Sequence, residues 1–311
     1  MAVHKVLPEK QNVYGSLSAE FEPILEIESG DTVQYATLDA GWGTQSPEGE
    51  HIRPFNPSQE TGRGHALCGP VKIAGAKKGM TLAVRVNDLV PGPIGFTSAG
   101  HYPNWQNEKM GLTDCEEITL HWQLDKKTMV GKTTFKDRGF SATLRPFMGI
   151  MGMPPEDKGM HRTVPPRFCG GNIDCKELAK GSTLYLPVPV DGGYFYVGDG
   201  HGAQGDGEIS CTAIECPMER VDLTFKLHED MHLERPIANT PNGWITFGFD
   251  EDLNEATVQA MDGMLNLMGD LFQLNRVEAM ALGSVAVDLK ITQVVNQVKG
   301  VHAILPHGAL R

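Results

Sequence analysis

One glycine-rich stretch carries an unusual density of side chains that can bind ions or move protons. It runs from Gly198 to Glu215 and reads Gly-Asp-Gly-His-Gly-Ala-Gln-Gly-Asp-Gly-Glu-Ile-Ser-Cys-Thr-Ala-Ile-Glu. Asp199 and His201 are two positions apart, so in an extended segment their side chains point to the same side. A carboxylate beside an imidazole suits zinc or a similar divalent ion. The same acids could instead bond backbone amides in a tight turn, and both interpretations stay open.

The segment from Gly200 to Gly205 also matches the spacing of the dinucleotide-binding fingerprint G-x-G-x-x-G. That fingerprint works only where a helix follows and presents its N-terminus to a pyrophosphate. Here a β-prone run follows and ends before Pro217. A nucleotide is therefore not expected.

A second polar cluster lies upstream at residues 167–174, Arg-Phe-Cys-Gly-Gly-Asn-Ile-Asp. Asn172 and Asp174 again alternate, and the glycines before them would let a substrate or ion approach the backbone. An Asx-type turn explains the same residues equally well. Cys169 is a candidate nucleophile for acyl transfer. Because no helix start and no basic neighbour except Arg167 would activate it, an incidental thiol is favoured.

Short strands are the elements expected to position these clusters. Apolar and β-branched runs recur at intervals of roughly ten residues, which favours a sandwich or barrel over βαβ units. Segments 21–27 and 31–38 are expected to form a hairpin around Ser29-Gly30. Further strands are expected at 71–74, 81–86, 117–124, 183–190, 194–197, 209–215, 220–227, 244–249, 285–295 and 301–305.

Loops and two helices complete the predicted fold, which is mainly β. Irregular segments are expected at 39–69, 91–116 and 140–166, the last rich in Met, Gly and Pro. Helical spacing predicts a helix over 253–274, capped by Asp250 or Asp252 and closed by Asn275, and a shorter helix over 276–283. We predict a β-sandwich or barrel-like architecture of two strand-rich sections, 1–140 and 167–311, in a single domain (1–311) with this helical pair packed on one face.

Composition narrows the range of partners. The chain has 27 Lys and Arg against 39 Asp and Glu, a formal net charge of −12, which repels phosphate and acidic membrane surfaces. Neither nucleic acid nor a membrane is expected as a partner. The N-terminus lacks the apolar core of a signal peptide and no two cysteines have zinc-ribbon spacing, so we expect a cytoplasmic protein with reduced thiols. Exposed strand edges favour a homo-oligomer.

Five short motifs between residues 170 and 215 carry a family resemblance. They are Gly-Gly-Asn-Ile-Asp at 170–174, Leu-Tyr-Leu-Pro-Val-Pro-Val at 184–190, Gly-Asp-Gly-His at 198–201, Gln-Gly-Asp-Gly-Glu at 204–208 and Ala-Ile-Glu at 213–215. In their order and spacing the chain resembles the acetamidase/formamidase family. Segments 66–70 and 288–293 also look like the family's, so the resemblance covers nearly the whole chain. The Ser-Ser-Lys and Glu-Lys-Cys motifs of other amidases are absent.

The resemblance implies hydrolysis of a short aliphatic carboxamide, formamide or acetamide, to the carboxylate and ammonia, with divalent cations in relatives. A metal ion would polarise the amide carbonyl and lower the pKa of water toward about 7. Asp174, Asp199 and His201 are the ligands that we predict. Asp39, from the long N-terminal loop, is a possible further ligand. Zinc is the favoured ion at the catalytic site, and calcium is the alternative.

Three side chains are predicted to act on the substrate of such an amidase. Glu215 is the candidate general base, which accepts the proton of the water and delivers it to the leaving nitrogen. Asn172 and Gln204 are candidates for positioning the amide NH2 group or the developing oxyanion.

Two alternatives remain at the level of sequence. The first is an amidase that depends on Cys169. The second is a β-sandwich protein without catalytic activity, in which Asp199, Asp206 and Glu208 bind calcium together with backbone carbonyls. His201 argues against the second, because imidazole is a poor calcium ligand.

Overall fold

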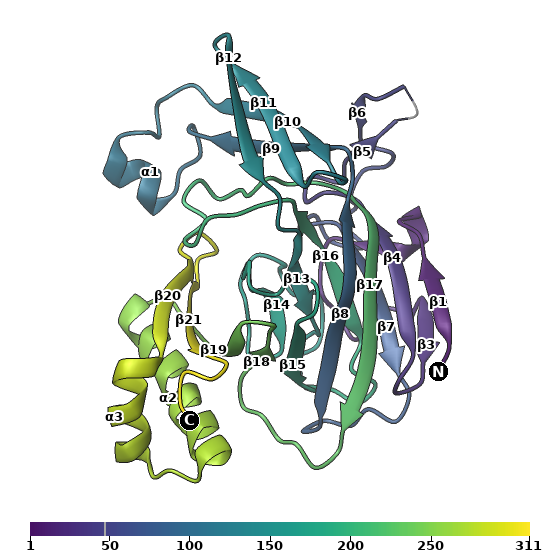
Figure 1. Cartoon of the computed structure of the whole chain (residues 1–311). Coiled ribbons are helices and arrows are strands. Elements are labelled where there is room, and N and C mark those ends of the chain that lie inside the picture. The colour runs from purple at the N-terminus through teal and green to yellow at the C-terminus, as the bar shows by residue number, and fades with distance from the viewer. Residues whose placement is uncertain (47) are drawn as a thin grey trace.

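The computed structural model describes residues 1–46 and 48–311 and is mainly β (Figure 1). Within these residues the largest sheet has nine strands, most of them antiparallel to their neighbours. In spatial order they are β1 (Val3–Val6), β4 (Thr32–Thr37), β17 (Met218–His228), β8 (Thr81–Pro91), β15 (Thr183–Pro187), β18 (Ile237–Asn239), β19 (Gly243–Asp250), β21 (Lys299–Pro306) and β20 (Asp288–Gln293).

A second sheet has six strands in the described part of the chain. Its order is β14 (Gly170–Asn172), β13 (Phe147–Gly152), β16 (Phe195–His201), β7 (Leu67–Ile73) and β2 (Val13–Tyr14), and β3 (Leu25–Ile27) pairs parallel with β7. Every residue of β13, β14 and β16 is buried. Polar side chains on these strands are therefore unusual and need an explanation.

The two sheets pack face to face around the main hydrophobic core. Val33 and Phe225 from the larger sheet share one buried cluster with Val71 and Phe195 from the smaller sheet. The rings of Phe195 and Phe225 have centroids 5.0 Å apart and meet edge to face. Along β4, buried and half-buried residues alternate, as expected for a strand with one face toward a core. The predicted β-sandwich is confirmed.

A four-stranded sheet projects from the sandwich at the top of Figure 1. Its order is β12 (Arg138–Thr143), β11 (Val130–Phe135), β10 (Ile118–Asp125) and β9 (Ile94–Ala99), and α1 (Trp105–Met110) lies between β9 and β10 in the chain. The prediction of an irregular 91–116 segment was therefore partly wrong. The segment 39–69, predicted as a loop, contains a small hairpin of β5 (Thr44–Gln45) and β6 (His51–Ile52). Near the N-terminus, a short 3-10 helix lies at Lys10–Asn12.

The C-terminal helical pair is confirmed. Helix α2 (Leu253–Phe272) starts at Asp252, which accepts a hydrogen bond from the backbone of Asn254, and it packs on β19 and β21. Gln273 ends α2 in a left-handed conformation, whereas Asn275 begins α3 (Arg276–Ala286) with a capping box. Asn275 was predicted to end the first helix, and its side chain instead satisfies the first N–H groups of the second. No helix among the described residues has the length and apolar character to cross a membrane.

One predicted hairpin, one predicted loop and one predicted strand are wrong for reasons of tertiary structure. Segments 21–27 and 31–38 do not form a hairpin, because β3 joins the smaller sheet and β4 the larger one. The Met-rich segment predicted as a loop contains β13, which lies in the middle of the smaller sheet. The strand predicted at 209–215 is a series of turns that ends in isolated bridges from Glu215 to Phe96 and His201.

Candidate active site

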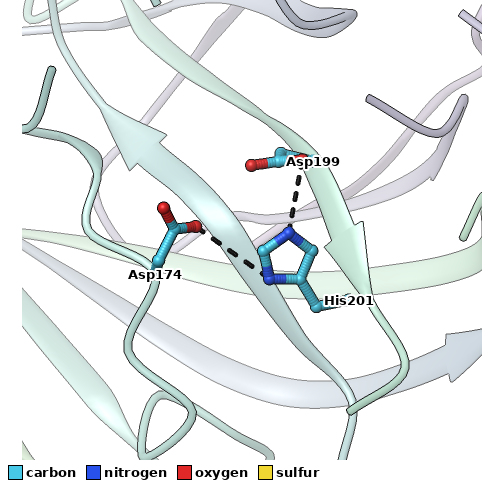
Figure 2. Close-up of side chains that lie close together, drawn as sticks. All are labelled: Asp174, Asp199 and His201. Atoms are coloured by element: carbon cyan, nitrogen blue, oxygen red, sulfur yellow. Dashed lines mark ion pairs between the residues drawn. The ribbon is translucent and has the colours of Figure 1, made fainter. Parts of the chain in front are cut away.

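Four buried ionisable side chains converge at the end of β16. Asp199 and His201 lie on this strand, Asp174 follows β14 by two residues, and Glu215 is bridged to His201 through the backbone. Nε2 of His201 lies 3.4 Å from Oδ1 of Asp199 and 3.3 Å from Oε2 of Glu215. Nδ1 of the same ring lies 3.9 Å from Oδ1 of Asp174 (Figure 2). The predicted residues Asp174, Asp199, His201 and Glu215 are thus brought together.

Glu208 joins this cluster, although the sequence did not single it out for the active site. Glu208, Glu215 and His201 each offer an atom within 4.8 Å of the others, and Asp174, Asp199 and His201 form a second such group. Glu208 is buried and has a left-handed backbone with φ of 47°. Its carboxylate reaches the same imidazole from the middle of the glycine-rich stretch.

The cluster leaves many of its polar atoms without a hydrogen bond. Among the described residues there is no hydrogen-bond partner for Oδ1 of Asp174, for either ring nitrogen of His201, or for Oε2 of Glu208 and Glu215. The distances from His201 are short enough for ion pairing but lack hydrogen-bond geometry. Buried polar atoms are nearly always paired, so several unpaired atoms facing one space indicate a missing partner. An imidazole with carboxylates is a donor set that fits a divalent cation.

Gly149 leaves the space that this cluster occupies. The pairing of β13 with β16 joins Met148 to Gly200 and Ile150 to Gly198, which puts Gly149 opposite Asp199. A Cβ atom at position 149 would lie 2.5 Å from Oδ2 of Asp199, 2.6 Å from Oδ1 of Asp174 and 2.9 Å from Cε1 of His201. Only glycine lets these three groups meet here.

Burial and charge shift the pKa values of the cluster. Burial, and then the charge of Asp199, raises the pKa of Asp174 to about 7. Burial also opposes ionisation of Asp199, but the charge of His201 outweighs it and holds the Asp199 pKa below its ordinary range. Burial raises the pKa values of Glu208 and Glu215. Against the effect of burial, Glu215 and Asp199 raise the pKa of His201. A bound cation would stabilise the ionised forms of Asp174, Glu208 and Glu215, whose pKa values are raised.

A chamber of about 500 Å³ opens over the cluster and is lined by Asp199, Glu208 and Glu215. Other polar groups along its wall are Arg53, Arg63, His65, Asn172, Cys211 and Asn296. The chamber connects the buried carboxylates to solvent. It is large enough for a small amide and a water molecule.

The two amide side chains predicted to touch substrate lie beside the cluster, but only Asn172 lines the chamber. Nδ2 of Asn172 donates to the carbonyl of Val164 (3.1 Å), and its Oδ1 is buried without a partner. Nε2 of Gln204 donates to the carbonyl of Asp174 (2.8 Å), which fixes that turn. Asn172 therefore offers an acceptor at the chamber, and Gln204 supports the turn that carries Asp174.

Asp39 lies apart from the ligand groups found among the described residues. Its Oδ2 lies 2.7 Å from Nε2 of His51, and its Oδ1 accepts the backbone N–H of Gly43 (2.7 Å). It lines a different and larger cavity of about 840 Å³, which shares Phe96 with the chamber. We assign the active site to the smaller chamber because Glu208 and Glu215, whose carboxylates each have an unpaired oxygen, line it.

Cys169 is buried and does not line the chamber. Its thiol donates to the carbonyl of Met153 (3.2 Å), and burial raises its pKa to about 12. A nucleophile must be ionised and reachable by its substrate. The geometry therefore argues against an amidase that depends on Cys169.

Sequence reasoning did not find Asn296, which supports the cluster from the C-terminal section. Its Nδ2 donates to Oδ2 of Asp174 (2.5 Å), and Asn296 also lines the chamber. It follows β20 in the chain, more than a hundred residues from its partner. No local pattern signals this contact.

Solved structures of acetamidases share this fold over nearly their whole length. The acetamidase from Bacillus halodurans superposes with a TM-score of 0.81 at 26% identity, covering 98% of this chain and 97% of the other. The acetamidase from Yersinia enterocolitica gives a TM-score of 0.82 at 25% identity, covering 99% and 93%. The fold and these relatives define an amidase, an enzyme that acts on carbon–nitrogen bonds.

The sequence comparisons match about half of the chain to one family. The model named Acetamidase/Formamidase family matches residues 157–308. The acetamidase of Mycolicibacterium smegmatis is 54% identical over 205 residues, a match that covers 49% of this chain and 50% of that protein. Over residues 157–308 the chain matches the acetamidase/formamidase family, which confirms the family resemblance of its motifs.

Proposed function

We propose that this chain hydrolyses short aliphatic carboxamides, such as formamide and acetamide, to the carboxylate and ammonia. The observation that carries the proposal is the convergence of buried, unpaired carboxylates on His201 under one small chamber. The match of residues 157–308 to the family model supports the same activity. In such a site water attacks the carbonyl carbon, the carbon–nitrogen bond breaks, and a proton passes from the water to the nitrogen.

Glu215 is the residue that we propose to move this proton. Its Oε1 accepts the backbone N–H of Ala213 (2.7 Å), which fixes the carboxylate, while Oε2 has no hydrogen-bond partner among the described residues. It lines the chamber, where water and substrate can reach it. Oδ1 of Asn172 can accept an N–H of the substrate amide and so orient the carbonyl toward the water.

We further propose that a divalent cation is held by Asp174, Asp199 and His201. When bound, the ion would supply the polarisation of the amide carbonyl and the more acidic water that an unreactive amide requires. The imidazole in the donor set favours zinc, and calcium is the alternative because carboxylate oxygens dominate. Asp39 is left out because His51 and Gly43 already engage its carboxylate.

Ammonia release from formamide and acetamide tests the activity. We expect Glu215→Gln to lower kcat about 100-fold or more, the typical contribution of a general base. Glu219→Gln, an exposed neighbour on β17, serves as the matched control and is expected to keep full activity. A wild-type protein that releases no ammonia from any small amide would refute the proposed function.

The metal is tested separately, by chelation, elemental analysis and zinc titration calorimetry. We expect stoichiometric zinc in the wild type, and weaker binding by at least about tenfold in Asp174→Asn. Full amidase activity in protein shown to be metal-free would refute the metal and leave the amidase standing.

We also propose a homo-oligomer, which exposed apolar side chains near the C-terminus support. Val277 and Val285 on α3 are 79% and 82% exposed, and Leu289 on the neighbouring strand is 46% exposed. Such patches mark association surfaces. Light scattering after gel filtration should give a multimer for the wild type and a smaller species for the double variant Val277→Lys, Val285→Lys. A monomeric wild type would refute this.

A further inference from the structure

His65 is a titratable residue at the chamber to which the proposed reaction assigns no role. It precedes β7 and is half-buried. It lines the chamber over the carboxylates and also an adjoining cavity of about 360 Å³. Its imidazole therefore stands where a substrate would pass or bind.

The orientation of this imidazole is fixed by one buried hydroxyl. Nδ1 of His65 lies 2.7 Å from Oγ1 of Thr163, and the backbone N–H of His65 donates to the same oxygen (3.1 Å). Thr163 is buried. Oγ1 accepts the backbone N–H, and among the described residues the hydroxyl proton has no acceptor other than Nδ1. Donation to Nδ1 is therefore the arrangement that uses this proton, and it leaves the imidazole hydrogen on Nε2.

The backbone before His65 is shaped to keep this contact. A Cβ atom at Gly64 would lie 2.2 Å from Oγ1 of Thr163, so a larger residue would push the hydroxyl away. The carbonyl of Gly64 accepts a hydrogen bond from Nε1 of Trp42 (2.8 Å). Gly64 thus leaves space for the contact between Thr163 and His65, and the hydrogen bond from Trp42 holds the backbone beside it.

Arg53 and Arg63 also carry donors on the chamber wall, but both are exposed and no hydrogen bond among the described residues fixes them, whereas a buried hydroxyl fixes His65. Asn172 faces the chamber with an unpaired oxygen, and Nδ2 of Asn296 is engaged by Asp174. The hydroxyl of Thr212 donates to the carbonyl of Ser98 (2.9 Å). Amide hydrolysis develops negative charge on the carbonyl oxygen, and a placed donor stabilises it.

We propose that His65 donates its Nε2–H to the carbonyl oxygen of the substrate amide, and that Thr163 is the positioning residue that holds the required tautomer. This role rests on the proposed amidase function. It needs only neutral imidazole, since the donated hydrogen stays on Nε2.

Kinetics of four variants test the donor. Removing one oxyanion donor typically costs about 100-fold or more in kcat, so we expect that loss in His65→Ala with KM changed less than about threefold. Thr163→Val should lower kcat about tenfold, whereas Thr163→Ser, which keeps the hydroxyl, should stay within about threefold of wild type. His121→Ala removes an exposed histidine of β10 and is the matched control.

A nitrogen-15 NMR spectrum of histidine-labelled protein gives a readout besides activity. We expect the Nε2–H tautomer for His65 in the wild type and in Thr163→Ser, and a mixture in Thr163→Val. An Nδ1–H tautomer, or a His65→Ala variant as active as His121→Ala, would overturn the inference. If the wild type hydrolyses no amide, the proposed function itself fails, and the tautomer still shows whether Thr163 orients His65.

Discussion

Gly149→Ala adds only one methyl group, and we expect it to disrupt the active site severely. The added methyl carbon would lie 2.5 Å from Asp199 and 2.6 Å from Asp174, roughly 1 Å inside ordinary contact distance. Both carboxylates are buried, and a hydrogen bond from Asn296 holds Asp174. The added methyl must therefore push Asp199 toward the chamber that it lines, which spreads the cluster.

The expected loss follows from the size of that displacement. A misplacement of about 1 Å in a catalytic arrangement can cost about 100-fold in rate. Overpacking costs about 1–3 kcal/mol in stability. With an unfolding entropy of about 2 cal/mol/K per residue, this lowers the melting temperature of 311 residues by only about 2–5 °C. Activity should therefore collapse while the fold survives.

The assay compares Gly149→Ala with Gly139→Ala, whose added methyl would meet nothing within 4 Å. Ammonia release, zinc titration and thermal unfolding by circular dichroism are measured on both variants. We expect about 100-fold lower kcat and weaker zinc binding in Gly149→Ala alone. Equal kcat and equal zinc affinity in the two variants would refute the reasoning that links this glycine to the geometry of the cluster.

Three further predictions concern residues around the site. Burial lowers the pKa of His302 to about 4, below its ordinary value near 6.5. The unfolded chain therefore takes up a proton at this residue before the folded chain does, and the free energy of unfolding falls as the pH drops from 6.5 toward 4. At pH 5 the free energy of unfolding is lower by about 2 kcal/mol. In urea unfolding, the free energy of His302→Gln should depend less steeply on pH than that of the wild type, and an equal dependence would contradict this prediction. Cys169→Ala should keep kcat within about twofold, and loss of turnover would restore the thiol alternative. Asn296→Leu removes the hydrogen bond to Asp174, worth about 1.5–3 kcal/mol, and should weaken zinc binding at least about tenfold; unchanged binding by calorimetry would contradict this.

The elements that sequence predicts best are those with a regular period. The 3.6-residue spacing of buried Met264 and Met268 gives α2, and the alternation along β4 gives a strand with one buried face. Strand β13 was missed because all of its residues are buried, so neither period appears in its sequence. The pairing of β3 and β4 with different sheets depends on distant partners that no local pattern encodes.

The predicted site residues divide in a similar way. Asp199 and His201 meet because a strand places residues two apart on one side, and the sequence shows that directly. Glu215 reaches them although the strand predicted before it is absent, because its backbone bridges to His201. Asp39 was proposed as a ligand from residue type alone, and the structure engages it with His51 instead.

Backbone strain is the feature of this site that sequence reveals least. Asp174, Asp199 and Glu208 have φ values of 52°, 60° and 47°, a region that non-glycine residues seldom adopt. Each such residue costs of order 1 kcal/mol or more and persists only where its surroundings fix it. The chain has glycine at many neighbouring positions, so glycine here would have relieved the strain. Carboxylates occupy three strained positions around one imidazole, where glycine would form the same turns without strain. The function of these positions therefore lies in their carboxylates and not in the shape of the turns.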